Sequence, residues 1–202
     1  MTKRQENKEK KQAAILAAAL GVFSEKGFAA AKIIDIATAA HVGKGTIYEY
    51  FRSKDDLFFA LCQWYVDQTA AAAMVSAQSL GGRVEERLCT LIETLVEAMS
   101  KEIDTFSIFL EFWAAAANPS MRDRYRSALL AMYDRLRGLV IGLVEEGRET
   151  GVFREDVDPF TIAAGVVGAM DGVMFQAWMD RGFHAPQVAS RFTRTLVRGM
   201  KA

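Results

Sequence analysis

The chain has 202 residues, of which 51% are hydrophobic and 25% are charged, and its formal net charge is zero. This is the composition of a soluble globular protein and excludes the disordered and collagen-like classes. No run approaches the ~18 consecutive apolar residues of a membrane-spanning helix, and residues 1–12 are too polar for a signal peptide. We therefore expect a cytoplasmic protein with no membrane partner.

Charge is distributed unevenly along the chain. Residues 1–54 hold ten Lys or Arg and five Asp or Glu, whereas the remainder holds 15 and 20. A basic N-terminal module is thus attached to an acidic body, and basic modules favour polyanionic partners. Many helices simply carry a solvated charged face, so the charge alone does not establish such a partner.

Helical periodicity extends over nearly the whole chain, which contains only three prolines. We predict an all-α protein, with Gly27 as a left-handed C-cap, a capping box at Ser53 and Asp56, and an N-cap at Asp158. The N-terminal tail is the one candidate for disorder, and Gly81–Gly82 and Asn118–Pro119 separate helices. The expected helices cover about residues 6–26, 33–40, 44–51, 54–77, 84–101, 104–116, 120–150, 159–181 and 186–202.

The segment from Ile36 to Phe51 has the layout of a helix-turn-helix. Ala37 is small enough for two short helices to cross steeply, and the tight turn falls at residues 41–43. The apolar side is expected to consist of Ile36, Ala40, Val42, Ile47 and Phe51. At 100° per residue, the opposite face of the second helix carries glycine, threonine, tyrosine and glutamate, which suits insertion into a DNA major groove.

These residues resemble the tetracycline-repressor (TetR) family of transcription regulators. The resemblance covers about 45 consecutive residues, and beyond them extends only to the number and lengths of helices. The matching residues are Ile15–Ala19, Phe23, Glu25, Gly27, Phe28, Asp35–Ala37, Lys44–Tyr48, Tyr50, Phe51 and Ser53–Leu57.

The resemblance implies a homodimer whose last two helices pair and whose C-terminal domain encloses a ligand pocket. It also implies a three-helix DNA-binding domain over residues 1–53 and a bundle of about six helices over residues 54–202. Two positions depart from the family pattern. His41 stands where the turn usually has glycine, and Ala31-Lys32 stands where hydroxyl residues usually open the second helix.

The predicted DNA contacts lie around the second helix of this motif. A cation at Lys54 opposes the dipole of its own helix, and a bound phosphate would reverse that effect. Glu49 either accepts a hydrogen bond from cytosine or repels phosphates, and the alternative for the others is a solvated or packing role. The predicted contacts to double-stranded DNA are Lys32, Lys44, Gly45, Thr46, Tyr48, Glu49, Tyr50 and Lys54.

Aromatic residues of the C-terminal part suggest a pocket for a small, largely hydrophobic effector, since imperfectly packed rings leave room for apolar ligands. The alternative is that these residues are core. The predicted pocket residues are Trp64, Phe109, Phe112, Trp113, Tyr133 and Phe175.

Three glycines share one side of the penultimate helix, where small residues permit close helix approach. We predict a dimer interface of Gly165, Gly168, Gly172 and Trp178, the alternative being close packing within one subunit. Asp171 lies amid apolar neighbours and, if buried, needs a partner.

Catalytic and metal-binding constellations are not found in the sequence. The two histidines, His41 and His184, are far apart, and Cys62 and Cys89 are expected to be core residues in a reducing compartment. We expect no cofactor, no metal and no enzymatic activity. The predicted function is repression by occupancy of a palindromic operator, relieved by the effector. The rivals are a helical ligand-binding or scaffold protein without DNA recognition, and a helical enzyme.

Overall fold

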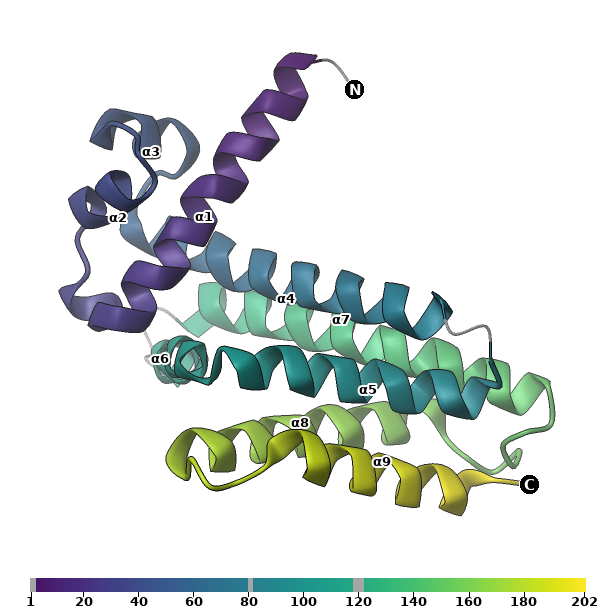
Figure 1. Ribbon diagram of the computed structural model, residues 1–202. Coiled ribbons are helices and arrows are strands. Elements are labelled where there is room, and N and C mark those ends of the chain that lie inside the picture. Colours follow the sequence, from purple (N-terminus) through teal and green to yellow (C-terminus); the bar gives the residue numbers. More distant parts are fainter. Residues whose placement is uncertain (1–2, 80–81, 118–121) are drawn as a thin grey trace. The chain divides into compact units, whose positions relative to one another are not determined.

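The computed structural model describes residues 3–79, 82–117 and 122–202 (Figure 1). The predicted all-α class is confirmed, and within these ranges the chain forms nine α-helices and one short 3-10 helix. The expected breaks at Gly81 and Asn118–Pro119 lie outside the described residues. The helices are α1 (Lys3–Ala30), α2 (Ile33–Ala39), α3 (Lys44–Tyr50), α4 (Lys54–Ser79), α5 (Val84–Lys101), η1 (Ile103–Thr105), α6 (Phe106–Ala117), α7 (Arg122–Glu149), α8 (Pro159–Met179) and α9 (Ala185–Met200).

Helix α1 is longer than the sequence predicts. It begins at Lys3, within the segment that the sequence suggests as a candidate for disorder. Lysine, glutamate and glutamine are good helix formers, which explains the helix there. The Gln5 side chain donates to Glu9 one turn later, at 3.0 Å. At the other end the helix kinks at Gly27, whose φ of 72° and ψ of 162° are open to glycine but differ from the left-handed helical conformation of the predicted C-cap.

Asp158 takes its predicted capping role, and the predicted capping box at Ser53 and Asp56 forms in part. Ser53 Oγ accepts from Asp56 N at 3.0 Å, so the capping box forms its first bond. The Asp56 carboxylate accepts from Arg52 N, one residue before the expected position. Asp158 Oδ1 accepts from Thr161 N at 2.8 Å and opens α8.

Two compact units make up the molecule. The first comprises Met1–Val66 with Ser107–Ala128, and the second comprises Asp67–Phe106 with Leu129–Ala202. These units differ from the expected division at residues 53 and 54, because the first half of α4 and nearly all of α6 belong with the helix-turn-helix. The functional division into DNA-binding and sensing domains stays a prediction.

The core of the first unit is built on aromatic rings. The ring of Phe58 on α4 lies 5.3 Å from that of Phe23 and 4.6 Å from that of Phe28, both on α1. On its other side it lies 5.8 Å from the ring of Phe112 on α6. Ring pairs at these separations stabilise beyond their buried area. Helices α1, α4 and α6 are therefore joined by one continuous aromatic cluster.

The core of the second unit lies between α5, α8 and α9, which run alongside one another (Figure 1). Helix α5 buries Leu88, Leu91 and Leu95 at helical spacing. Beyond α7 the chain turns at Gly151, where φ is 70°, and its loop pairs with the end of α9 through Arg154 N and Met200 O at 2.9 Å.

Helices α1 and α8 are long and apolar enough to cross a membrane, by length and composition alone. A core helix of a soluble protein passes the same test. Each of the two helices buries part of its apolar surface in its own unit, at Ile15 and Phe23 of α1 and at Val166 and Met174 of α8. That burial covers 28% of the apolar window of α1 and 33% of that of α8.

Candidate DNA-binding and regulatory sites

The predicted helix-turn-helix forms between α2 and α3. The turn is closed by hydrogen bonds from Val42 N to Ala37 O at 2.9 Å and from His41 N to Thr38 O at 3.1 Å, the pattern of a Schellman motif. That motif places its central residue at positive φ, and His41 takes φ 54°. Histidine tolerates this conformation better than most residues, so the turn forms without glycine.

The apolar side of the motif is buried at three of its five predicted positions. Ile36 and Ile47 are fully buried, and Phe51 is 3% exposed. Ala40 and Val42, which were expected to be buried, are only half-buried. The orientation of α3 is thus fixed by Ile47 and Phe51, one turn apart, and its opposite side faces outward.

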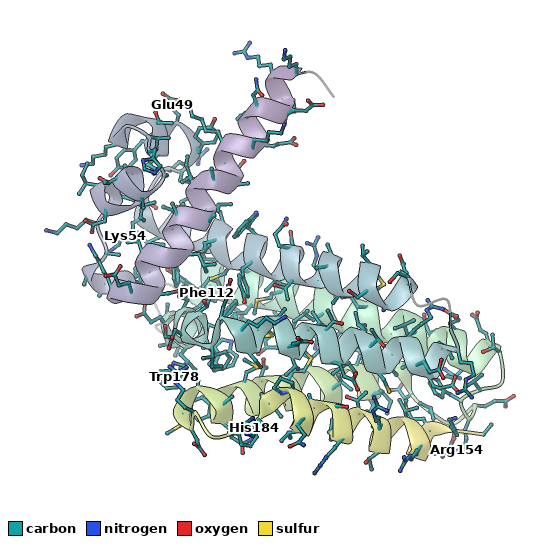
Figure 2. The ribbon with its side chains drawn as sticks, in the orientation of Figure 1. Glu49, Lys54, Phe112, Arg154, Trp178 and His184 are labelled. Carbon is teal, nitrogen blue, oxygen red and sulfur yellow. The ribbon has the colours of Figure 1, made fainter. Side chains whose placement is uncertain are left out.

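The outward side of α3 carries the predicted DNA contacts. Lys44, Gly45, Tyr48 and Glu49 are exposed, and Figure 2 shows Glu49 at the outer edge of the helix. Lys44 Nζ lies 5.9 Å from the centre of the Tyr48 ring. A Cβ atom added to Gly45 meets no atom of the described residues within 4 Å, so they give no packing reason for a glycine there.

The remaining contacts predicted near this face are Thr46, Tyr50 and Lys32. Thr46 and Tyr50 are half-buried at the flanks of α3. Lys32 is exposed just before α2, where its backbone N–H donates to Asp35 Oδ2 at 3.0 Å. This hydrogen bond, together with the charge of Lys26, holds the pKa of Asp35 below its usual value. The Lys32 ammonium is left on the surface.

Lys54 takes a role that the sequence did not indicate. Its ammonium donates to the carbonyl oxygens of Phe28 at 2.7 Å, Ala31 at 3.0 Å and Ala29 at 3.3 Å. These carbonyls follow the kink at Gly27, where a cation interacts favourably with the end of a helix. They explain a lysine in the first turn of α4, and a phosphate contact would have to replace one of these three bonds.

The predicted effector residues do not all fall in one unit. Trp64, Phe109, Phe112 and Trp113 belong to the first unit, and Tyr133 and Phe175 belong to the second. Phe112 is 2% exposed, with its ring centre 5.2 Å from that of Phe59 and 5.0 Å from that of Tyr125. The structure therefore makes Phe112 a core residue, the alternative considered for it.

Phe109 is also buried, and its ring packs 5.6 Å from that of Tyr65. Trp64 and Trp113 remain half-buried. These two large rings are the members of the predicted set in the first unit that keep surface for a ligand.

Tyr133 is engaged by Asp171, the isolated charge of α8. The Tyr133 hydroxyl donates to Asp171 Oδ2 at 2.7 Å, so the expected partner of this aspartate exists. Burial raises the pKa of Asp171 to about 6, and the hydrogen bond opposes that shift only in part. Tyr133 is thus the hydrogen-bond partner of a half-buried acid.

Helices α8 and α9 expose several large apolar side chains and three glycines. The predicted interface residues Gly165, Gly168 and Gly172 are all exposed, and a Cβ added to each meets no atom within 4 Å in the described part of the chain. Close packing within one subunit is therefore not their role. Trp178 is half-buried near the end of α8 (Figure 2). Large apolar side chains exposed on these two helices are Phe160, Phe175, Met179, Val188 and Phe192.

Phe175 belongs to this apolar surface rather than to an enclosed pocket. It is 41% exposed, and its ring centre lies 6.3 Å from that of Trp178. The two cysteines are free thiols, with Cys62 buried and Cys89 half-buried. Among the residues that the structure describes, no group of three or more His, Cys, Asp or Glu side chains is placed to hold a metal ion.

The sequence did not single out Glu111 as a structural residue. Its Oε2 accepts from Phe28 N at 2.8 Å, across 83 residues of sequence. A Cβ added to Gly27 would lie 3.0 Å from Glu111 Oε1, so glycine also makes room for this carboxylate. Its place amid apolar residues on α6 was the only sequence signal for such a role.

This fold, with an exposed second helix behind a helix-turn-helix turn, defines the chain as a helix-turn-helix DNA-binding regulator. The family model for bacterial regulatory proteins of the tetR family matches residues 15–61. The model for the C-terminal part of BetI-type transcriptional repressors matches residues 84–201. The chain belongs to the TetR family of transcription regulators, and the resemblance found in the sequence is confirmed.

Several characterised relatives and solved structures are similar over most of the chain. The transcriptional repressor DhaR of Mycobacterium sp. (strain GP1) is 27% identical, with 79% of this chain and 78% of DhaR covered. A putative TetR-family regulator from Rhodococcus sp. has a TM-score of 0.79 at 17% identity, covering 96% and 100%. FadR of Bacillus subtilis, solved in complex with stearoyl-CoA, has a TM-score of 0.72 at 21% identity, covering 92% and 96%.

Proposed function

We propose that this regulator acts as a cytoplasmic homodimer on an inverted-repeat operator and is released by a small, largely hydrophobic effector. One observation carries the DNA part of the proposal. Helix α3 buries Ile47 and Phe51 and leaves Lys44, Gly45 and Tyr48 exposed on its opposite side. A short helix with a polar, sterically open face fits the major groove.

Each residue of this face has a distinct proposed role. Lys44 and Lys32 neutralise phosphates, and Thr46, Tyr48 and Tyr50 donate hydrogen bonds to phosphates or base edges. Gly45 lets the backbone approach the DNA closely. Glu49 accepts a hydrogen bond from a cytosine amino group or repels phosphates. Lys54 supports this face by holding the carbonyl groups beyond Gly27, and its loss acts on DNA binding through the position of α1.

The apolar side of α8 and α9 supports the homodimer. Phe175 and the 68% exposed Met179 lie on the same helix as the three exposed glycines, and exposed apolar side chains of this size favour a covering partner. The open space above Gly165, Gly168 and Gly172 allows a second copy to approach α8 closely. A two-fold axis would place the α8 and α9 surface of one subunit against the same surface of the other.

Sedimentation of two leucine variants tests this interface. Gly168→Leu fits a folded monomer, because nothing lies within 4 Å of the added Cβ, but blocks close approach of a partner. We expect it to shift the protein from dimer to monomer with unchanged helix content. Gly142→Leu on α7, where the surroundings are equally open, is the matched control. A monomeric wild type at micromolar concentration would contradict the proposal.

The effector part is supported by the half-buried Trp64 and Trp113. The relative FadR of B. subtilis holds stearoyl-CoA, a ligand with a long apolar chain. The test is calorimetric titration of the protein with fatty acids, acyl-CoAs and aromatic acids, with and without operator DNA. Linkage requires operator to weaken the affinity for an effector by the factor by which effector weakens the affinity for operator. If the affinity for a ligand is the same with and without operator DNA, that ligand does not act on DNA release.

A further inference from the structure

The first turns of α1, residues 3–11, lie beyond the core of their unit. Every residue of this stretch is exposed, and the first buried residue of the helix is Ile15. At 1.5 Å per residue the helix runs about 18 Å from Lys3 to Ile15. Figure 1 shows this end of α1 projecting away from the other helices of the first unit. Most helical stability in proteins comes from the packing of a buried face, so packing does not explain these turns.

The charges of residues 3–11 are sorted onto two sides of the helix. Arg4, Lys8 and Lys11 are three and four residues apart, so they share one side. The same spacing leads on to Ile15 and, two turns later, to Val22, which are both buried. Arg4, Lys8 and Lys11 form what we call the basic row. It therefore lies on the side that α1 turns toward the rest of its unit.

The other side of these turns carries mixed charges. Lys3, Glu6 and Lys10 share it, and Glu6 precedes Lys10 by four residues, the order that stabilises a helix. No glutamate of residues 3–11 lies on the basic row, whose neighbouring cations repel one another and so destabilise the helix. Among the described residues, the side chains of the basic row make no ion pair or hydrogen bond. Contacts within the protein therefore do not account for this row.

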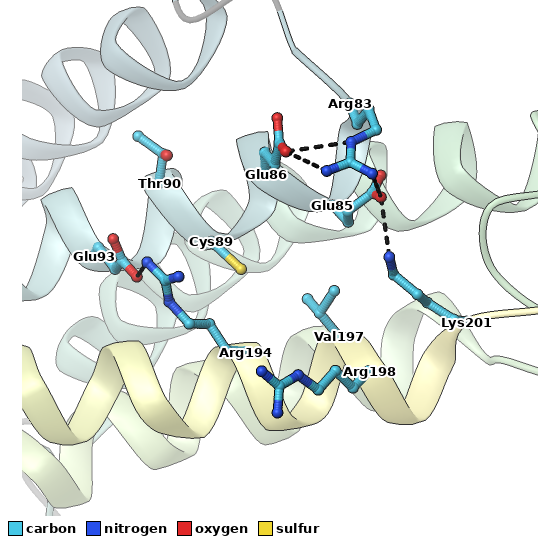
Figure 3. A pocket seen from close by; sticks show the side chains of 10 residues that line it. All are labelled: Arg83, Glu85, Glu86, Cys89, Thr90, Glu93, Arg194, Val197, Arg198 and Lys201. Atoms are coloured by element: carbon cyan, nitrogen blue, oxygen red, sulfur yellow. Dashed lines mark hydrogen bonds and ion pairs between the residues drawn. The ribbon is translucent and has the colours of Figure 1, made fainter.

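Cations in the charged cleft between α5 and α9 show the opposite pattern (Figure 3). Three of its four cations pair with the three carboxylates of its walls. These pairs join Arg83 to Glu86 at 2.6 Å, Arg194 to Glu93 at 3.2 Å and Lys201 to Glu85 at 3.2 Å. A cation that pairs within the protein needs no outside partner, whereas three neighbouring cations without an anion suit a polyanion.

We propose that the basic row binds phosphates of the DNA backbone beside the major groove that α3 enters. The inference rests on the proposed function, and it adds a contact that is independent of base sequence. The row runs about 10.5 Å from Arg4 to Lys11. Each DNA strand carries one charge per about 3.4 Å of helix axis, so a row of this length spans about three phosphates. Helices α1 and α3 belong to one compact unit, so docking of α3 sets the position of the basic row on the duplex.

The salt dependence of DNA affinity tests this contact, measured with the full-length protein on a fragment that the wild type selects from a random pool. Lys8→Gln/Lys11→Gln removes two charges of the basic row. Lys3→Gln/Lys10→Gln removes two charges from the other side of the same turns and is the matched control. Glutamine is nearly as good a helix former as lysine, so both variants should keep their helix content. We expect the basic-row variant to lower the magnitude of the salt slope by about 2 per subunit, and to weaken binding to the selected fragment and to unrelated duplex alike. The control should stay close to wild type.

Ethylation of single phosphates on the selected fragment gives a second readout, because it removes one backbone charge at a time. Ethylated phosphates beside the groove that α3 enters should weaken binding of the wild type and of the control, but not of Lys8→Gln/Lys11→Gln. An unchanged salt slope in this variant would show that the basic row is only solvated, and an equal change in the control would reduce the effect to net charge. Either result would overturn the proposal. A wild type that binds no DNA would instead contradict the proposed function, and this inference with it.

Discussion

The Glu111 carboxylate on α6 accepts a hydrogen bond from the backbone N–H of Phe28, immediately after the kink of α1. This bond links α6 to α1, and both helices belong to the compact unit that contains the helix-turn-helix. In Glu111→Ala the Phe28 N–H loses its partner, which we expect to cost about 1–2 kcal/mol of unfolding free energy. Glu111→Gln keeps an accepting oxygen and should cost less.

Thermal unfolding of these two variants and hydrogen exchange at the Phe28 amide measure this effect. Exchange at Phe28 should accelerate in Glu111→Ala and stay close to wild type in Glu111→Gln. Unchanged exchange in both variants would show that the bond does not form in solution.

Substitutions of Lys54 and of Lys44 should have different effects on the salt dependence of DNA affinity. Lys54→Ala leaves three carbonyl oxygens without their donor and should lower the free energy of unfolding by about 1–2 kcal/mol. In this variant the salt dependence of DNA affinity should change little, because the Lys54 ammonium is bonded within the protein. Lys44→Ala should instead reduce the magnitude of the salt slope by about 1 per subunit. A reduced slope in Lys54→Ala would show that this lysine contacts phosphate after all.

Gly45→Ala should stabilise the protein and weaken its DNA binding. Alanine is better than glycine in a helix by up to about 1 kcal/mol, and the added methyl meets no atom of the protein. We expect a higher melting temperature with weaker DNA affinity, since the methyl blocks close backbone approach. Gly21→Ala on α1 is the matched control, exposed and equally open, and should stabilise without affecting DNA affinity.

Asp171 should make stability fall as pH rises from about 4 to about 6. Its pKa is about 6 in the folded protein and 3.8 ordinarily. Over that interval the folded state binds more protons than the unfolded state. Asp171→Asn keeps an acceptor for the Tyr133 hydroxyl and should raise the free energy of unfolding at pH 7 by about 1–3 kcal/mol. Urea unfolding from pH 4 to pH 7 checks this, and parallel pH profiles of the variant and wild type would contradict it.

Features with local causes were predictable from the sequence. The break in α1 at Gly27, the turn at residues 41–43 and the cap at Asp158 each depend on a few adjacent residues, and each falls where the sequence predicts it. The burial of Ile47 and Phe51 follows from helical periodicity in the same way.

Features made by residues distant in sequence were not predictable. The carbonyl partners of Lys54 lie 23–26 residues away, and the bond from Phe28 to Glu111 spans 83. Aromatic spacing on α6 could not distinguish a ligand wall from a packed core, because the neighbours of Phe112 come from α4 and α7. The compact units likewise depend on contacts between distant segments, which periodicity along the chain does not report.

Selection of fragments from a random DNA pool by the full-length protein, followed by sequencing, tests the central claim most directly. If α3 of each subunit reads a major groove, the selected fragments share an inverted repeat whose half-site centres lie about 10 base pairs, or a multiple of that, apart. Lys44→Ala should weaken binding to that repeat, whereas the exposed control Gly21→Ala should not. Fragments without dyad symmetry would contradict a dimer that reads DNA through α3.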